Sequence, residues 1–384
     1  MSGSGFDLAV VGAGVMGLGC ALAAAKEGRK VAVLDPSQES AKSSWAAAGI
    51  LVTRDAHNFL SPFREFYVRS IHMYPAWLGE IAGQSGIAVP LHRGGDHLIY
   101  DLDSEPGLEQ YQAKLKQLDR EHSRAYTVTD ELPSFLRGFS RLGKVKAFHF
   151  PGEAYVQNRD LLAALQAACL KAGVHTVVGS ASGAWDYSAG RSRIPLDDGE
   201  IEARQVLLSA GAWSGKVLEG LGIAAPMIPV KGQLRRIRKF YPEGSMVHFN
   251  DDIYLVPRGD SLIVGATTEP GVWREGFDAT GEEYLGGHLE RLLPDISKEP
   301  IENWSGFRPR TKDRLPWMGW IDIDRGWAIC TGHYKCGLSM APLAALCMTR
   351  LMMGEKPPVD LTPFHPWRPK GLAKGLVKGL AKLQ

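Results

Sequence analysis

The stretch that decides the fold is Phe6-Asp7-Leu8-Ala9-Val10-Val11-Gly12-Ala13-Gly14-Val15-Met16-Gly17, near the start of a chain of 384 residues. Its first half is a short apolar run, which predicts a buried parallel strand. A glycine-rich turn follows, and the alanine-rich sequence to about Lys26 predicts a helix. Gly12, Gly14 and Gly17 have the G-x-G-x-x-G spacing with which a strand–turn–helix unit binds a dinucleotide.

Each glycine of this turn has a physical reason. Gly12 permits the tight turn, Gly14 lets the backbone approach a pyrophosphate, and Gly17 allows the helix to pack closely on the strand. The free N–H groups and the positive partial charge of the helix N-terminus then favour phosphate. A second buried strand ends at Asp35, 18 residues after Gly17. We expect Asp35 to bind a ribose diol, and an acid at this position favours FAD or NAD over NADP.

Composition places the chain among soluble globular proteins of two to three domains. Hydrophobic residues make up 45% and charged residues 22%. The 44 Lys and Arg against 42 Asp and Glu give a net charge of +2, which does not support a nucleic-acid binder. The last 15 residues, 370–384, hold four Lys and no acid, so the basic excess comes from this tail. A second basic run, residues 235–239, is expected on a solvated strand edge.

The five cysteines are scattered and odd in number, which argues against a disulfide framework. None has the C-x-x-C spacing of a zinc site, so no metal is expected. Residues 8–25 carry no charge, but Asp7 precedes them and glycines interrupt them, unlike a signal or membrane helix. These patterns predict a reduced, cytoplasmic protein.

Hydrophobic periodicity predicts helices that alternate with strands along the chain. Helical patterns cover residues 61–82 (kinked or restarted at Pro75), 108–118, 160–172 (with Asn158 as a possible cap), 282–293 and 337–353. Strand patterns cover residues 174–178, 205–209 and 328–331, and residues 253–267 form a predicted hairpin around Arg258-Gly259-Asp260. The fold class that follows is α/β: a discontinuous Rossmann-like domain with an inserted, mainly antiparallel β domain.

Seven further segments carry a resemblance to a known family. They are Ser43-Ser44-Trp45-Ala46-Ala47-Ala48-Gly49-Ile50-Leu51, Ser209-Ala210-Gly211-Ala212-Trp213-Ser214, Val230-Lys231-Gly232-Gln233, Tyr254-Leu255-Val256-Pro257-Arg258, Val264-Gly265-Ala266-Thr267, Trp304-Ser305-Gly306-Phe307-Arg308-Pro309 and Gly332-His333-Tyr334-Lys335-Cys336-Gly337-Leu338. With the glycine turn they resemble the D-amino-acid oxidase family of FAD-dependent oxidoreductases, most closely its glycine oxidase and sarcosine oxidase branch. The resemblance runs from about residue 6 to residue 355.

The resemblance implies non-covalent FAD, extended across the first domain. It places residues 43–50 along the pyrophosphate and flavin. It also places the helix that follows Gly332 near the flavin pyrimidine, where its dipole stabilises negative charge. The residues expected to contact FAD are Gly12, Gly14, Val15, Met16, Gly17, Asp35, Pro36, Ser43, Ser44, Ala47, Ala48, Gly49, Ile50, Ala210, Gly211, Trp213, Arg308, Gly332, Tyr334, Lys335, Gly337 and Leu338.

On the substrate side, the resemblance implies that Arg308 clamps a carboxylate, because a guanidinium matches a carboxylate with two hydrogen bonds. Tyr254 is expected to contribute a hydroxyl, and Lys335 is the third predicted catalytic residue. From the residues alone, Arg308 fits an inter-domain ion pair and Tyr254 fits a packed hairpin aromatic as alternatives.

Three departures from the glycine oxidase pattern put glycine itself in doubt. Asp252 stands where those oxidases have His, Thr268 where they have Met, and Lys335 where they have Arg. Asp252 in the pocket would favour a cationic or hydroxylated substrate. The other interpretation is that Asp252 only caps the turn at residues 250–252.

The predicted domains are 1–85, 150–221 and 305–369 for FAD, 86–149 and 222–304 for the substrate, and 370–384 as a basic tail. Repeated Lys-Gly-Leu units in the tail suggest either a flexible or partner-docked segment or a membrane-surface helix.

The expected reaction is oxidation of the carbon–nitrogen bond of an amino acid or secondary amine by hydride transfer to flavin. Oxygen or a quinone then takes up the electrons. The alternatives are an NAD-dependent dehydrogenase and a flavin-bearing electron-transfer or assembly subunit without a substrate of its own.

Overall fold

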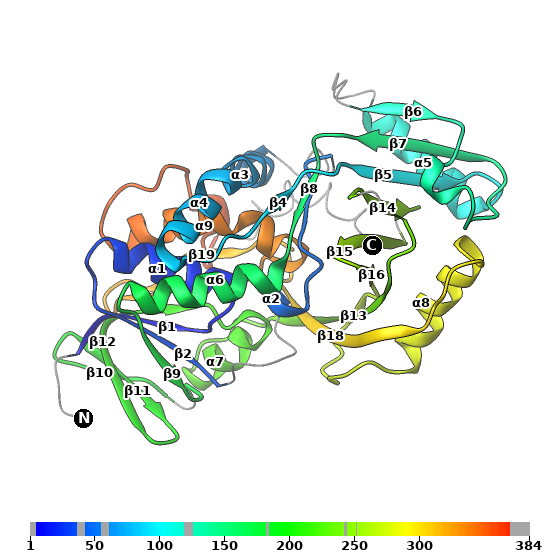
Figure 1. Ribbon diagram of the computed structural model, residues 1–384. Coiled ribbons are helices and arrows are strands. Elements are labelled where there is room, and N and C mark those ends of the chain that lie inside the picture. Colours follow the sequence, from blue (N-terminus) through cyan, green and yellow to red (C-terminus); the bar gives the residue numbers. More distant parts are fainter. Residues whose placement is uncertain are drawn as a thin grey trace.

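The computed structural model describes residues 5–36, 43–54, 61–118, 126–181, 184–241, 244–250 and 252–368. The basic tail therefore lies outside the described residues, and its predicted contact with a membrane or a partner stays a prediction. Two large sheets lie side by side, and helices cover the outer side of each (Figure 1).

The first sheet has eight strands around a parallel core of order β20–β12–β1–β2–β9. Its strands are β1 (Phe6–Val11), β2 (Val31–Asp35), β9 (His175–Val178), β10 (Asp186–Ser188), β11 (Arg191–Leu196), β12 (Gly199–Leu208), β19 (Trp317–Asp322) and β20 (Trp327–Thr331). The predicted strand–turn–helix at the start of the chain is confirmed, and β1 lies in the middle of the parallel core. This places the glycine turn at the carboxyl edge of the sheet.

Five helices cover one face of this sheet: α1 (Val15–Lys26), α3 (Ser61–His72), α4 (Tyr74–Ser85), α6 (Asn158–Lys171) and α9 (Gly337–Met352). The opposite face packs against the β10–β11 hairpin and the short helix α7 (Ser214–Gly220) rather than against a second layer of long helices. Pro75 restarts the helix, as predicted, because it lies in the first turn of α4, where its missing N–H has no partner to lose.

The second sheet has nine strands in the order β6–β7–β5–β14–β15–β16–β13–β18, with β17 also paired to β13. They are β5 (Asp96–Asp101), β6 (Thr127–Thr129), β7 (Val145–Phe150), β13 (Ile228–Arg238), β14 (Met246–Phe249), β15 (Ile253–Arg258), β16 (Ser261–Gly265), β17 (Glu269–Pro270) and β18 (Pro300–Arg310). The sheet is mainly antiparallel, and its parallel pair is β5 with β14. The hairpin predicted over residues 253–267 is present as β15 and β16.

One face of the second sheet carries α8 (Ala279–Leu292), and α5 (Glu105–Leu118) packs on the end formed by β5 and β7. The other face contacts residues 45–52 and the small sheet made of β3 (Ile50–Leu51), β8 (Ala154–Val156) and β4 (Leu91–His92). Short helical turns complete the chain: α2 (Ser43–Ala46), η2 (Ser134–Leu136), η3 (Gly211–Trp213), η4 (Tyr334–Cys336) and η5 (Thr362–Phe364). The predicted domain limits stay a prediction.

The expectation of a solvated edge for residues 235–239 is wrong for Arg235. Strand β13 is central, because β16 and β18 pair with its two sides over these residues. Arg235 is only 2% exposed, and its guanidinium pairs with Glu282 of α8. The partner comes from a helix 47 residues later in the chain, which the local charge pattern does not reveal. Within the described part of the chain, none of the helices is both long and apolar enough to cross a membrane.

Candidate active site

The glycine turn between β1 and α1 has the close contacts that its motif predicts. Gly12 has a φ of 112°, and a Cβ added there would meet the backbone of Ser209 and Ala210. A Cβ added at Gly17 would overlap the carbonyl oxygen of Gly12, so the helix approaches the turn more closely than any other residue allows. The first turn of α1 carries no acidic residue, which leaves its positive end for an anion.

Asp35 and Ser44 lie against this turn. Asp35 is buried at the end of β2, and its Oδ2 atom accepts a hydrogen bond of 2.7 Å from the Ala13 N–H. The Ser44 hydroxyl accepts a hydrogen bond of 3.1 Å from the Val15 N–H. The carboxylate is therefore at the place where the sequence expects it, beside the Gly-rich turn, with Pro36 directly after it.

Residues 43–50 are held in place by two side chains for which sequence analysis gave no such role. Asn158 was expected as a possible cap, but α6 begins at Asn158 itself. Its side-chain amide instead donates hydrogen bonds of 2.8 Å to the carbonyls of Ser44 and Trp45. The Arg258 guanidinium donates to the carbonyl of Ala48 and to Asn158. Burial lowers the pKa of Arg258 to about 10, so it stays a cation at neutral pH.

The same segment contains Gly49, whose φ is 78° and whose added Cβ would overlap the carbonyl oxygen of Val156. The Ser43 hydroxyl donates to the carbonyl of Phe307 on β18. The segment therefore joins the first sheet to the second, and its small residues are needed because backbone lies close on both sides.

The segment after β12 approaches the same region. Gly211 has a φ of 53°, and its carbonyl accepts a hydrogen bond of 3.2 Å from Thr331. Trp213 packs against Trp273 and Phe307, with ring centroids 5.5 and 5.8 Å away. Ala210 precedes η3 at its N-cap.

The C-terminal glycine motif turns the chain from β20 into α9. Gly332 has a φ of 80° and Tyr334 a φ of 51°, so the turn is tight and strained at Tyr334. Lys335 is exposed, and its Nζ atom lies 5.6 Å from the centroid of the Tyr334 ring. Gly337 and Leu338 begin α9, whose first turn has no acidic residue and which packs beside α1.

His333 is buried inside this motif. Burial lowers the pKa of its imidazole to about 3, so the ring is neutral near pH 7. Its Nε2 atom is buried without a hydrogen-bond partner among the described residues. A buried polar atom in this condition is costly unless a further group satisfies it.

Arg308 and Tyr254 meet on the face of the second sheet that contacts residues 45–52. Arg308 stands on β18, and its guanidinium lies over Gly232 of the neighbouring strand β13. Tyr254 stands on β15 opposite Gly265 of β16, and its ring and hydroxyl lie over that glycine. The two glycines thus leave room for two long side chains to lie flat on the sheet and point toward each other.

The guanidinium of Arg308 has only neutral partners among the described residues. It hydrogen-bonds to the Tyr254 hydroxyl, and its Nη1 atom donates a bond of 3.0 Å to the carbonyl of Thr267. Burial raises the pKa of Tyr254, against the opposing effect of Arg308, so the hydroxyl keeps its proton. No carboxylate of the described chain contacts Arg308, so the ion-pair alternative does not describe it, whereas Tyr254 also packs against the apolar cluster of this face.

His248 is a neighbour of Tyr254 that sequence analysis missed. It stands on β14 directly opposite Tyr254, and the centroids of the two rings are 5.7 Å apart. Its Nδ1 atom lies 2.8 Å from the carboxylate of Asp96, which is fully buried and paired with Arg54. No local signal in the sequence joins these three residues, because they come from three separate segments.

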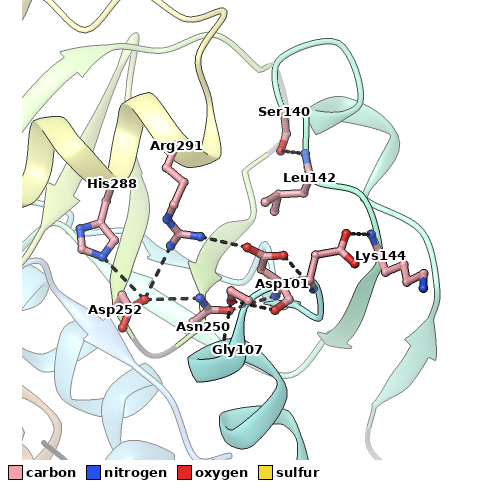
Figure 2. A network of polar contacts seen from close by, with 11 residues as sticks. Asp101, Gly107, Ser140, Leu142, Lys144, Asn250, Asp252, His288 and Arg291 are labelled. Atoms are coloured by element: carbon pink, nitrogen blue, oxygen red, sulfur yellow. Dashed lines mark hydrogen bonds and ion pairs between the residues drawn. The ribbon is translucent and has the colours of Figure 1, made fainter.

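Of the two interpretations of Asp252, the structure agrees with the turn residue, because its carboxylate does not face this region. Figure 2 shows its carboxylate between His288 and Arg291 of α8, with contacts of 3.6 and 3.8 Å. The Asn250 amide also donates to it, at 3.3 Å, which agrees with the turn interpretation. Asp252 precedes the first residue of β15, so the side-chain alternation of the strand does not reach it. Thr268 is exposed. It lies between Thr267, which is buried, and Glu269, which is half-buried.

The residues around the first sheet fit a dinucleotide. The turn is a cradle that a Cβ at Gly12 or Gly17 would fill, two helices without acid in their first turns begin nearby, and Asp35 ends the second strand. Across the described segments, no group of three or more His, Cys, Asp or Glu side chains is placed to hold a metal ion.

Comparison with known proteins gives one consistent result. Residues 7–351 match the family model described as DAO, FAD dependent oxidoreductase. The chain is 31% identical to a glycine oxidase of Pseudomonas aeruginosa over 93% of this chain and 97% of that protein. It is 29% identical to a glycine oxidase of Geobacillus kaustophilus, over 94% and 96% of the two chains. A crystal structure of glycine oxidase from Geobacillus kaustophilus superposes with a TM-score of 0.84 at 26% identity, over 95% of this chain and 99% of that one.

Proposed function

The chain belongs to the DAO family of FAD-dependent oxidoreductases, and from this premise we propose that it oxidises the carbon–nitrogen bond of a small amino acid or secondary amine. The family match decides between the two dinucleotides left open by the glycine turn, in favour of FAD. The cofactor is held without a covalent bond.

The residues that would hold FAD are those of the glycine turn, Asp35, residues 43–50, residues 210–213 and residues 332–338. When bound, FAD supplies a two-electron acceptor that takes a hydride from the carbon bearing the amine. We assign to Arg258 and Asn158 the task of fixing residues 43–50, because both hydrogen-bond to backbone carbonyls of that segment. The neutral His333 is available as a hydrogen-bonding group beneath the turn that begins α9.

The observation that carries the proposal is the Arg308–Tyr254 pair. A half-buried guanidinium whose described partners are a hydroxyl and a carbonyl keeps its full charge for an anionic ligand. A substrate carboxylate fits the fork of Arg308, and Tyr254 donates its hydroxyl proton to the same carboxylate or to the amine side. Fixing the substrate in this way supplies most of the rate enhancement, since hydride transfer from a neutral amine needs little further acid–base chemistry.

The product of this step is an imine, which water hydrolyses to a carbonyl compound and an amine or ammonia. Oxygen or a quinone is the proposed electron acceptor. Asp252 points to α8 and no longer argues against glycine as the substrate. The chain still differs from the glycine oxidase pattern at Thr268 and Lys335.

The test is anaerobic bleaching of the bound flavin by a panel of amino acids and secondary amines, with and without a carboxylate. Arg308→Ala should lower kcat/KM for carboxylate substrates roughly 100-fold, because two charge-assisted hydrogen bonds contribute about 3 kcal/mol together. The kcat/KM of Arg308→Lys should lie between those of the native chain and Arg308→Ala, because lysine keeps the charge and loses the fork. Arg141→Ala is the matched control, because Arg141 is exposed and pairs with Asp295 at the far side of the second sheet.

Equal kinetics for Arg308→Ala and Arg141→Ala would overturn the role of Arg308. Absence of bleaching by every compound would favour the other candidate, a flavin-bearing subunit without a substrate of its own.

A further inference from the structure

A row of polar side chains crosses the second sheet on the face that holds Arg308. From one end to the other it consists of Asp96 on β5, His248 on β14, Tyr254 on β15 and Arg308 on β18, with glycines at the crossings of β16 and β13. The function proposed above uses Arg308 and Tyr254 only. His248 lies next to Asp96, toward the other end of the row, and has no part in that function.

His248 is held in one orientation by a buried ion pair. The Asp96 carboxylate is fully buried, and one of its oxygens lies 2.8 Å from the Nδ1 atom of His248. Its other oxygen pairs with Arg54, which is 7% exposed. Because a carboxylate accepts hydrogen bonds, Nδ1 carries the proton. The Nε2 atom then points away from Asp96.

The Nε2 atom has no hydrogen-bond partner among the described residues. The His248 side chain keeps 14% of its surface exposed. Burying the charges of Asp96 and Arg54 costs desolvation free energy, and the pair fixes which ring nitrogen of His248 is left for a ligand.

The spacing of the row sets the length of such a ligand. The guanidinium of Arg308 lies over β13, and His248 stands on β14, three strands further along, which is about 14 Å between the backbones. Side chains that lean toward each other shorten this gap, but the carboxylate and nitrogen of glycine are only about 2.5 Å apart. A substrate that reaches both Arg308 and His248 is therefore longer than glycine.

We propose that His248 is a specificity-determining residue that binds a second polar group of the substrate through its Nε2 atom. The substrate class is then an amino acid that carries a hydroxyl, amide or carboxylate beyond its amine, as a side chain or as a substituent on nitrogen. This inference rests on the proposed function, because it takes Arg308 as the carboxylate anchor. It also supplies the second polar contact that Asp252 would have made under its pocket interpretation.

The test compares substrates in matched pairs with two variants of His248. N-ethylglycine is compared with N-(2-hydroxyethyl)glycine and with iminodiacetate, so that the added group is apolar, hydroxyl or carboxylate. His248→Asn keeps an amide near the Nδ1 position to bond Asp96 and removes the Nε2 contact, whereas His248→Gln places its amide near the Nε2 position.

For the native chain, kcat/KM should favour the polar member of a pair by roughly tenfold or more, as expected for one hydrogen bond to a buried polar group. His248→Asn should remove most of this preference, mainly through KM, and leave N-ethylglycine within about twofold. His248→Gln should keep part of the preference. A purely structural role would give the opposite order, because His248→Asn preserves the bond to Asp96.

The outcomes separate the two proposals. Bleaching by all three compounds without preference, or an equal loss on all three in His248→Asn, would overturn the role of His248 and leave the amine oxidase function standing. No bleaching by any compound of the wider panel would instead overturn the proposed function. Flavin absorbance and thermal unfolding of each variant show that it is folded and loaded.

Discussion

At Lys231 and at Arg308, the two faces of the second sheet surround a cation in opposite ways. On the face toward α8, the polar residues of β13 are paired with acids. Lys231 is fully buried and lies 2.7 Å from Asp278, and Gln233 donates to Asp278 at 2.8 Å and to Glu269 at 2.9 Å. On the face toward residues 45–52, the residue between them is Gly232, and the Arg308 guanidinium above it has neutral partners.

Neighbouring residues of β13 therefore contribute to different properties, to stability on one face and to substrate binding on the other. A charge whose field is cancelled by a fixed acid cannot bind an anionic ligand strongly, so the α8 face is a closed network that holds the helix to the sheet. A charge that is oriented by hydroxyl and carbonyl groups keeps its field. Substitution of Lys231 on the α8 face should therefore lower the free energy of unfolding. Substitutions around Arg308 on the other face should instead change kcat/KM for the substrate.

The largest effect is expected from Lys231→Met. Removing the buried cation leaves the Asp278 carboxylate with Gln233, Arg274 and the Thr280 N–H as its partners, and the free energy of unfolding should fall by about 3 kcal/mol. Urea denaturation measures this loss. The kinetic constants of the folded fraction should stay within a few-fold of the native values. A loss of substrate binding without a loss of stability would contradict the assignment of the two faces.

Asp278→Asn in the Lys231→Met background is the control for this prediction. Asp278 begins α8 as its N-cap, with its side chain accepting from the Thr280 N–H at 3.0 Å. An asparagine keeps the cap and removes the charge that Lys231 no longer balances, so about 1 kcal/mol should return. The pKa of Asp278 lies well below its ordinary value because Lys231 hydrogen-bonds to it, so the carboxylate is ionised across the neutral range.

Gly232→Ala tests the other face with a single methyl group. The added Cβ would occupy the place of the Arg308 guanidinium, which is the far end of a flexible side chain and can move. We expect kcat/KM to fall roughly 10-fold, because a displacement of about 1 Å at the anchor is enough to misplace the substrate. The free energy of unfolding should change by less than about 1 kcal/mol.

Gly287→Ala on α8 is the matched control, since a Cβ there meets no atom within 4 Å. It should leave the kinetics unchanged and stabilise the helix by up to about 1 kcal/mol. Unchanged kinetics in Gly232→Ala would mean that the position of the guanidinium over β13 does not matter for substrate.

The nucleotide-binding end was predictable because its determinants are close in sequence. The turn from Gly12 to Gly17 and the acid at Asp35 lie within one strand–helix–strand unit, and the glycines are required by contacts inside that unit. The family motifs also predicted Arg308 and Tyr254 as site residues. In the structure, Gly232 and Gly265 leave the space in which these two side chains meet. Residue spacing alone does not explain those two glycines, because their role depends on which strands pair with each other.

The rest depends on pairing between distant segments. His248 and Asp96 are 152 residues apart in the chain, and they meet only because β14 pairs with β5 on one side and with β15 on the other. A strand pattern states which residues share a face but not which strand is its neighbour. The place of Asp252 was left open for a different reason, since the residue lies outside β15, where the alternation no longer holds.

The smallest effect is expected from the polar cluster of Figure 2, where the Asp252 carboxylate joins the turn before β15 to α8. The hydrogen bond to Asp252 raises the pKa of His288, against burial and the nearby Arg291. Burial alone would raise the pKa of Asp252, but the hydrogen bonds from His288 and Asn250 outweigh it and lower that pKa. The pair is therefore ionised from below the ordinary pKa of aspartate to above that of histidine.

The sign of the pH effect follows from these two directions. A raised pKa of His288 in the folded state gives stability that is present below about pH 6.5 and is lost as pH rises through the folded-state value. The part due to Asp252 is lost only in acid. Urea unfolding at pH 5.5, 7 and 8.5 should show that the native chain loses up to about 1 kcal/mol relative to His288→Gln across this range. Parallel stability curves for the two proteins would show that the cluster contributes by packing rather than by charge, and the contrast between the two faces would then rest on β13 alone.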